Sequence, residues 1–257
     1  MNYKNTPSFY NNVEFFNKYL GQTSYYNSLQ NVVKKTIKIT NPHRVLEFGS
    51  ALGTTTLAMA KEYPNIVFLG SDIREDIIIK ANNNAKTIAN ATFVQADMCE
   101  YVALPTLSEF DLIFLLYSFH HIIDPLDNKA EFLKNCYANM KIGSYLLITE
   151  TFLPEDVEGL KENSQIEKLF EQRGIEGYAS TFWNALNSLQ EVELAKEVAN
   201  ISLKEELEAG FLVNKRKDEY LVKFSWLVEI AKSCGFKVVI AEPVNSIMEK
   251  ALLLQKV

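Results

Sequence analysis

Short, almost wholly apolar runs alternate along the chain with longer segments in which apolar residues recur every three or four positions. The runs are typical of strands buried on both faces of a sheet, and the longer segments are typical of helices with one buried face. This alternation predicts an α/β fold with a parallel sheet, in which the fourth, almost wholly apolar strand is central. The strands predicted in this region are 45–48, 66–70, 91–95, 110–116 and 145–149.

The pattern changes on both sides of this region. Two helices are predicted within residues 1–41, the second of them from about Thr23. Residues 154–218 are predicted to be a helical insertion, and two further strands follow at 236–241 and 251–255. Because the loop between these last strands is too short for a crossover helix, they are predicted to pair antiparallel.

The bend RVLEFGSALGTTT at residues 44–56 joins the first strand to the following helix. A strand, a glycine turn and a helix N-terminus form a ligand site in open α/β sheets, because backbone N–H groups and the helix dipole face the ligand. Gly49 and Gly53 allow a sharp turn there. The spacing E-x-G-x-x-x-G has Ala51 in place of the middle glycine with which a dinucleotide fingerprint wraps a pyrophosphate. An ordinary strand-to-helix turn remains the alternative at this point.

The composition limits the kinds of partner and the cellular compartments that are expected for this chain. A chain of 257 residues suits one large domain, or one domain with an insertion. Its net charge of −6 disfavours a general nucleic-acid binder, which would show a basic face. No apolar stretch approaches the ~20 residues of a membrane span, and the polar start of the chain does not read as a signal peptide. The three widely separated cysteines have no metal-type spacing, so reduced thiols in the cytoplasm are expected.

Five strand-end motifs occur in order along the chain: VLEFGSALG, LGSD, QADM, FDLIFLLYSFHHI and KIGSYLLITE. With these motifs and the terminal strand pair, the chain resembles the class I S-adenosylmethionine-dependent methyltransferases over about residues 42–153 and 220–257. The resemblance implies a Rossmann-like seven-stranded sheet, parallel with a terminal antiparallel strand pair, and S-adenosylmethionine as the cofactor. Because this cofactor carries no phosphate, a bend with fewer glycines suffices to hold it.

By this resemblance, the bend lines the methionine and ribose parts of the cofactor, and Asp72 accepts hydrogen bonds from both ribose hydroxyls. Asp97 accepts one from the adenine amine, and Met98 packs on the adenine ring. The structural alternatives are a helix cap for Asp72, a solvated loop acid for Asp97 and a core residue for Met98. Ala51 replaces a glycine that many members have, which is tolerable if its φ is negative. The cofactor-binding residues predicted in this way are Glu47, Gly49, Ser50, Ala51, Gly53, Asp72, Ile73, Asp97, Met98, Tyr117 and Tyr26.

Two histidines directly follow the fourth strand, at the carboxyl end of the sheet where such sites open. Methyl transfer is an in-line displacement, and it needs a general base only when the nucleophile is protonated and weakly acidic. If that base is a histidine, it is His120 or His121, because His43 precedes the first strand and lies at the opposite edge. A helix-cap or packing role is the alternative. Catechol-type members bind a divalent metal through an acid at the end of the fourth strand, where this chain has Leu116-Tyr117-Ser118, so no metal is expected.

The function expected first is methyl transfer to an oxygen, nitrogen or carbon of a small organic molecule. The N-P-P-Y motif of enzymes that act on adenine in nucleic acid is missing, which disfavours a nucleic-acid substrate. Residues 1–41 are predicted to be an N-terminal helical lid, residues 42–153 and 219–257 the cofactor-binding core, and residues 154–218 a substrate cover. Whether the chain forms a homodimer is left open. The aromatic residues available to the substrate pocket, each with burial in the core as its alternative, are Tyr25, Phe152, Tyr178, Phe182 and Trp183.

Two other functions compete with this expectation. One is a methyltransferase-like binding or scaffold protein that keeps the fold without catalysis, against which the acids Asp72 and Asp97 weigh. The other is a nicotinamide-dependent reductase, which the glycine spacing and the terminal strand pair disfavour.

Overall fold

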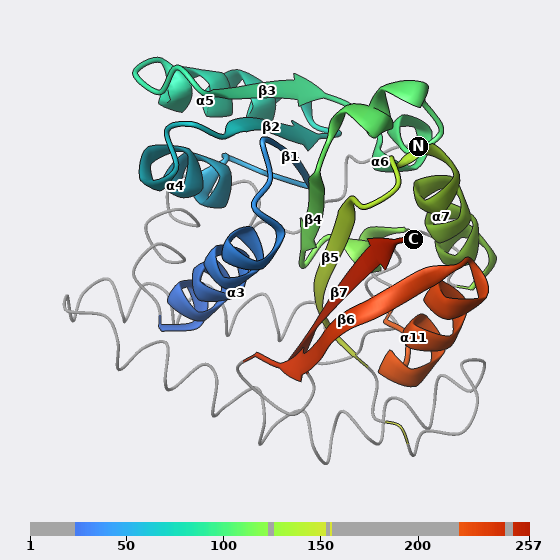
Figure 1. Ribbon diagram of the computed structural model, residues 1–257. Coiled ribbons are helices and arrows are strands. Elements are labelled where there is room, and N and C mark those ends of the chain that lie inside the picture. Colours follow the sequence, from blue (N-terminus) through green and yellow to red (C-terminus); the bar gives the residue numbers. More distant parts are fainter. Residues whose placement is uncertain (1–23, 123–125, 153–154, 156–220, 245–248) are drawn as a thin grey trace, which may run out of the picture. The chain divides into compact units, whose positions relative to one another are not determined.

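The computed structural model describes residues 24–122, 126–152, 155, 221–244 and 249–257, with residues 24–26 described by their backbone alone. These residues contain one seven-stranded sheet with the order β3-β2-β1-β4-β5-β7-β6 (Figure 1). The strands are β1 (Arg44–Phe48), β2 (Val67–Asp72), β3 (Ala91–Gln95), β4 (Leu112–Leu116), β5 (Tyr145–Thr151), β6 (Phe236–Pro243) and β7 (Glu249–Lys256).

The central strand of the sheet is β4, as its apolar sequence predicts. Its first four residues, 112–115, are 0% exposed. It pairs in parallel with β1 on one side and with β5 on the other. A strand that is paired on both edges and covered on both faces has no position for a polar side chain, which explains the sequence LIFLL. Polar side chains therefore begin only beyond its carboxyl end.

Among the described strands, β7 alone runs against the others. It pairs antiparallel with β5, and β6 pairs antiparallel with β7 at the edge of the sheet. Only residues 244–248 connect β6 to β7, too few for a crossover helix. The predicted antiparallel pair is confirmed.

Helices cover both faces of the sheet (Figure 1). One apolar cluster joins α3 and α4 to one face through residues such as Val33 and Met59. A second cluster joins α7 and α11 to the other face through Phe132 and Leu227. Alternate strand residues point to opposite faces, so the strands contribute to both clusters. The helices are α3 (Ser24–Thr40), α4 (Thr54–Glu62), α5 (Glu75–Ala85), α6 (Met98–Tyr101), α7 (Asp127–Asn139) and α11 (Phe224–Ser233), with 3₁₀ turns η2 (Pro105–Glu109) and η3 (Phe119–His121).

Two strand boundaries differ from the predicted ones. β4 begins at Leu112 and not at residue 110, and the Asp111 carboxylate just before it accepts the backbone N–H groups of His43 and Arg44, both at 2.8 Å. β5 continues to Thr151, which pairs with the first residue of β7. The first of the two predicted N-terminal helices and nearly all of the predicted insertion lie outside the described residues.

Two compact units make up the chain. One consists of Leu29–Glu155 and Asp218–Val257, and the other of Met1–Ser28 and Asp156–Lys217. Val33 and Ile37 of α3 are buried in the sheet unit, so the segment predicted as a lid includes residues that pack on the sheet. The roles of lid and substrate cover stay predictions.

Candidate functional site

The bend after β1 contains three residues in the left-handed backbone region. The φ angle is +69° at Gly49, +46° at Ala51 and +76° at Gly53. A left-handed conformation costs a residue with a side chain about 1–2 kcal/mol, so Ala51 is strained. A negative φ, which would make an alanine tolerable at this position, is therefore not found at Ala51. The backbone N–H of Ala51 donates to Asp72 Oδ2 at 3.1 Å, which ties the strained position to the end of β2.

Gly49 and Gly53 also have no room for a side chain. A Cβ on Gly49 would lie 2.5 Å from Ser118 Cβ, and one on Gly53 would lie 2.2 Å from Phe93 Cζ. Ser118 Oγ also donates to the carbonyl of Phe48 at 3.0 Å. The glycine at position 49 thus lets the bend after β1 pack directly against the turn after β4.

Glu47, on the buried strand β1, anchors the N-terminus of α4. Its side chain is nearly inaccessible, and its Oε2 accepts both the hydroxyl and the backbone N–H of Thr56, the N–H at 3.2 Å. The N-cap residue Gly53 has no side chain to do this. Burial raises the pKa of Glu47 to about 8 although the two bonds from Thr56 oppose this shift. Glu47 is therefore a carboxyl that changes protonation near neutral pH.

Asp72 ends β2 and reaches the same bend. Its Oδ2 accepts from Ala51 and its Oδ1 accepts the backbone N–H of Arg74 at 3.0 Å. Burial raises the pKa of Asp72, while the N–H donors and the Arg74 guanidinium lower it. Each oxygen of a carboxylate has two lone pairs, so each can accept one further donor. The Asp72 carboxylate could therefore accept hydrogen bonds from two adjacent hydroxyls, such as those of a ribose.

Asp97 lies at the neighbouring strand end. The backbone N–H of Ala96 donates to the carbonyl of Asp72 at 2.9 Å, so the ends of β2 and β3 are held together. Asp97 Oδ1 accepts the N–H of Cys99 at 2.9 Å and caps the short helix α6. Met98 packs against the larger apolar cluster. Asp72 and Asp97 thus lie at the carboxyl ends of neighbouring strands, as expected. Asp97 also caps a helix and Met98 also packs in the core, as their structural alternatives predicted.

The turn after β4 brings the two histidines to the same edge. Tyr117 has φ +51°, and its N–H donates to the carbonyl of Thr149 on β5 at 2.9 Å. Ser118 then serves as the N-cap residue of η3, which carries His120 and His121. Strained positions such as Tyr117 concentrate at functional sites. Since the bend after β1 packs on Ser118, the histidine turn and the bend belong to one assembly.

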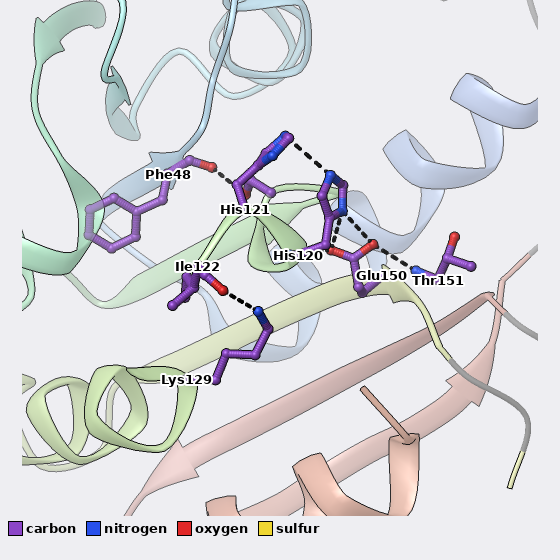
Figure 2. A network of polar contacts seen from close by, with 8 residues as sticks. Phe48, His120, His121, Ile122, Lys129, Glu150 and Thr151 are labelled. Carbon is purple, nitrogen blue, oxygen red and sulfur yellow. Dashed lines mark hydrogen bonds and ion pairs between the residues drawn. The ribbon is translucent and has the colours of Figure 1, made fainter. Parts of the chain in front are cut away.

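Glu150, at the carboxyl end of β5, binds the histidine turn (Figure 2). His120 Nδ1 lies 3.0 Å from both carboxylate oxygens. The backbone N–H groups of His120 and Thr151 also donate to this carboxylate, at 3.1 and 2.8 Å. His120 Nε2 in turn lies 3.1 Å from His121 Nε2. A carboxylate and two imidazoles therefore form a continuous chain of hydrogen bonds.

A buried lysine, Lys129, contacts the turn that carries the histidines. Lys129 on α7 is fully buried, and its Nζ donates to the carbonyl of Ile122 at 2.5 Å (Figure 2). The same Nζ lies 5.4 Å from the centre of the Phe119 ring. Burial lowers the pKa of Lys129 to about 8, against the charge of Glu150. The ammonium thus holds both ends of the turn that carries the histidines.

The remaining predicted site residues differ in their surroundings, and some of them lie outside the described residues. Ser50 Oγ is buried without a hydrogen-bond partner among the described residues, and it lies toward Gly70 of β2, where a Cβ would be 2.8 Å from it. Ile73 follows Asp72 and accepts from Gln95 Nε2 through its carbonyl at 3.1 Å. Phe152 is 1% exposed and packs edge-to-face on Phe224, which favours its alternative as a core aromatic. The side chains of Tyr25 and Tyr26 and all of Tyr178, Phe182 and Trp183 lie outside the described residues.

Four residues of the site were not singled out from the sequence: Thr56, Ser118, Lys129 and Glu150. A signal existed for two of them. Glu150 is an acid at the end of the apolar run LLIT, and Lys129 stands at helical spacing from Leu126 and Leu133 on the apolar face of α7. A charged residue in either position requires a buried partner. Thr56 and Ser118 gave no comparable signal, because their uncharged hydroxyl side chains do not require a buried charged partner.

Two kinds of feature are absent from the described residues. No group of three or more His, Cys, Asp or Glu side chains there is arranged to hold a metal ion. No helix among those residues is long and apolar enough to cross a membrane.

The chain is similar to known proteins in sequence and in fold. Residues 45–143 match the family model described as a methyltransferase domain. The carboxy-S-adenosyl-L-methionine synthase of Nautilia profundicola is 26% identical over 119 residues, which are 46% of this chain and 48% of that protein. The chain therefore spans about half the length of this curated relative.

Solved structures extend the likeness over nearly the whole chain. Human N-acetylserotonin methyltransferase, solved in complex with S-adenosylmethionine, superposes with a TM-score of 0.57 and 16% identity, over 97% of this chain and 58% of that chain. An O-methyltransferase family 2 protein from Planctomyces limnophilus, solved with apigenin, gives a TM-score of 0.52 and 16% identity, over 83% and 51%. At such identities these structures establish a shared fold.

Proposed function

We propose that the chain is a class I S-adenosylmethionine-dependent methyltransferase that transfers a methyl group to a hydroxyl of a small organic molecule. The methyltransferase-domain match of residues 45–143 and the shared fold support the family. The His120–Glu150 pair at the carboxyl ends of β4 and β5 is the observation that carries the choice of a hydroxyl. Oxygen, nitrogen and carbon nucleophiles share the displacement chemistry, but a general base helps most where a weakly acidic proton must be removed.

The residues at the edge of the sheet are suited to hold the cofactor. Asp72 presents acceptors for the ribose hydroxyls beside the bend of residues 49–53, and Asp97 lies at the next strand end for the adenine amine. Glu47, buried beneath the bend, offers a negative charge to the cationic methionine part when it is ionised. A cofactor without phosphate does not need the backbone to wrap a pyrophosphate. It is therefore compatible with Ala51 in the bend, and with Ser118 and Phe93 packed against Gly49 and Gly53.

The bound cofactor supplies a methyl carbon activated by its sulfonium sulfur. The chain has to orient the acceptor in line with that carbon, exclude water and remove the proton from the acceptor. The histidine turn is placed for the last of these tasks, because it packs against the cofactor bend through Ser118 and Gly49. The exit of β4 carries Leu116-Tyr117-Ser118 and no acid, which supports a base that works without a metal.

A transfer assay tests this function. S-adenosylmethionine labelled in its methyl group is incubated with the full chain and a panel of phenols, alcohols and amines. Label is expected in one or more hydroxyl acceptors, and substitution of both His120 and His121 by alanine is expected to lower that rate about 10²-fold or more. Label in amines alone would contradict the hydroxyl, and no labelled product from any acceptor would count against transfer.

An inactive, methyltransferase-like scaffold is the second candidate, and calorimetry separates it from the enzyme. The wild-type chain is titrated with S-adenosylhomocysteine and, as a control, with oxidised nicotinamide adenine dinucleotide. Heat is expected with the first ligand alone. Heat with neither ligand would favour a scaffold whose cofactor site has lapsed, and heat with the dinucleotide alone would favour a reductase.

We also propose that residues 154–218 cover the acceptor and that residues 1–41 close over the cofactor. The aromatic residues of the insertion support an apolar acceptor pocket. Substitution of Trp183 by alanine is expected to raise KM for the acceptor and to leave the affinity for S-adenosylhomocysteine unchanged. A loss of cofactor affinity alone would contradict this division of roles.

A further inference from the structure

We propose that Lys129 is a positioning residue of the methyl transfer, because its ammonium fixes the turn of residues 118–122 that carries His120 and His121. The inference rests on the proposed function, since it assigns a part in that reaction to a side chain outside the cofactor and base residues named above. It depends on where the side chain of this buried lysine ends, beside the turn (Figure 2).

Lys129 occupies a position where the helix otherwise buries apolar side chains. It is 0% exposed, and the other buried residues of α7 are Phe132, Leu133 and Cys136. An ammonium loses its hydration when it is buried, which costs free energy unless it meets compensating partners. A methionine of nearly the same length would fill this position without that cost. The partners that the ammonium meets therefore explain the lysine better than packing does.

The ammonium contacts residues on both sides of the histidines. Its Nζ donates to the carbonyl of Ile122 at 2.5 Å and lies 5.4 Å from the centre of the Phe119 ring, within the range of a cation–π interaction. Phe119 begins η3, and Ile122 directly follows it. Both residues are buried, so water screens these contacts little. Lys129 thus holds the beginning and the end of the turn.

The turn depends on such contacts because its own backbone hydrogen bonds are long. The N–H of His121 donates to the carbonyl of Ser118, and that of Ile122 donates to the carbonyl of Phe119, both at 3.2 Å. A 3₁₀ turn also has poorer hydrogen-bond geometry than an α-helix. Tyr117, which leads into the turn, has a left-handed φ of +51°. Contacts from outside the turn are therefore needed to fix the position of the histidines.

Two contacts of opposite charge reach the turn from neighbouring elements. The Glu150 carboxylate of β5 accepts the backbone N–H of His120 at 3.1 Å and lies 3.0 Å from Nδ1 of the same residue. Lys129 of α7 brings a positive charge, because burial lowers its pKa only to about 8, against the charge of Glu150, so the ammonium predominates at neutral pH. The turn is thus bonded to an anion at His120 and to a cation at Ile122.

Loss of the ammonium should displace the histidines more than it disturbs the cofactor bend. A base has to lie within hydrogen-bond reach of the proton that it removes, and a misplacement of about 1 Å can cost about 10²-fold in rate. The cofactor bend contacts the turn at Ser118, through Gly49. That contact does not involve Lys129. Turnover should therefore fall while the affinity for the cofactor is retained.

Kinetics test this role with two lysines of the same helix. Lys129→Met removes the buried ammonium and keeps the length of the side chain, and Lys134→Met removes an exposed ammonium as the matched control. With a hydroxyl acceptor from the panel, we expect Lys129→Met to lower kcat about 10²-fold. KM for the acceptor and the affinity for S-adenosylhomocysteine should change little, and Lys134→Met should match the wild type. An unchanged kcat, or equal losses of kcat and of S-adenosylhomocysteine affinity, would overturn the positioning role.

Nitrogen-15 NMR of histidine-labelled protein tests the same role without any acceptor. The sequence has three histidines, so His120→Gln and His121→Gln assign the signals, and His43, which precedes β1, is the reference. With S-adenosylhomocysteine present, Lys129→Met is expected to shift the ring signals of His120 and His121, whereas Lys134→Met should leave them unchanged. Ring signals that ignore the Lys129 substitution would overturn the role. A panel without any product would instead refute the proposed function, and the NMR result would still decide whether Lys129 positions the turn.

Lys129→Gln covers the case in which the methionine variant shows no cooperative unfolding in urea. Glutamine keeps an N–H donor, but it has no charge and reaches less far toward Ile122. The same loss of kcat with retained S-adenosylhomocysteine affinity is expected, to a smaller extent. A glutamine variant with wild-type kcat would overturn the role of the ammonium. Failure of both variants to fold would make Lys129 a residue needed for folding and would overturn the positioning role as well.

Discussion

Glu47 shows how burial sets the charge of a single residue in this site. Its pKa is raised from 4.5 to about 8, so the folded chain binds a proton that the unfolded chain releases. The stabilising effect of that proton is fully present below pH about 4.5 and is lost as the pH rises through about 8. The loss amounts to roughly 1.4 kcal/mol per pH unit within that window.

Glu47→Gln keeps an acceptor for Thr56 and removes the titration. Urea unfolding of both proteins at pH 5, 6, 7 and 8 is expected to show the wild-type free energy of unfolding falling relative to that of the variant as the pH rises. The difference between the two proteins removes the contribution of all other titrating groups. Parallel curves for wild type and variant would show that Glu47 is ionised throughout.

Ala51 stores strain in the cofactor bend. Its φ of +46° is unfavourable for a residue with a Cβ, and its N–H is fixed by Asp72. Ala51→Gly is expected to raise the free energy of unfolding by about 0.5–1 kcal/mol, because relief of the left-handed strain outweighs the entropy of the added glycine. Ala58→Gly, inside α4, is the control and should destabilise by about 1 kcal/mol. Destabilisation of similar size in both variants would contradict the strain.

At the scale of elements, the bend after β1 can pack against the turn after β4 because Gly49 has no side chain. A Cβ on Gly49 would clash with Ser118, whereas a Cβ on Gly143, which also has positive φ, would meet nothing within 4 Å. Gly143→Ala is expected to cost about 1 kcal/mol through its backbone alone. Gly49→Ala should cost about 1–3 kcal/mol more through the clash, as measured by urea unfolding. Equal costs would show that Ser118 moves away freely.

The strands and helices of the sheet follow from local patterns, and this explains why they were predictable. β3 (Ala91–Gln95) has the predicted bounds, and the observed starts of α3 and β1 each differ from the predicted starts by one residue. These elements were predictable because the spacing of apolar residues within a short segment indicates a strand or a helix. The short turns η2 and η3 were missed. η3 combines buried Phe119 and His120 with half-buried His121 over three residues, which is too short for any period to appear.

The contacts of the site were less predictable because they join residues far apart in sequence. Asp72 and Asp97 could be placed at one edge, since parallel strands end together. Glu150 and His120, which are hydrogen-bonded, are 30 residues apart in sequence, and Ser118 and Phe48 are 70 residues apart. Similarly, the glycines of the bend suggested close approach of a ligand, whereas the contacts found at Gly49 and Gly53 are with Ser118 and Phe93.

At the scale of the sheet unit, the groups assigned to the proposed methyl transfer lie at the carboxyl ends of neighbouring strands. The carboxyl ends of β1, β2 and β3 supply the cofactor bend, Asp72 and Asp97, and those of β4 and β5 supply the histidine turn and Glu150. The proposed cofactor residues and the proposed base residues therefore come from neighbouring strands that pair directly. Binding at this edge should stabilise the unit as a whole, because the ligand binds the folded state alone.

S-adenosylhomocysteine at about 100 times its Kd is accordingly expected to raise the free energy of unfolding by about 2.7 kcal/mol. Asp72→Asn replaces one carboxylate acceptor by an amide donor and removes the charge, which should weaken binding by ~1.5–3 kcal/mol. At the same ligand concentration the increment should then fall to about 1.4 kcal/mol or less. Asp76→Asn is the matched control, because the Asp76 side chain is exposed and accepts hydrogen bonds from the Arg74 guanidinium. Comparing the increment within each variant cancels its own change in stability, so an increment in Asp72→Asn as large as in wild type would place the ribose elsewhere.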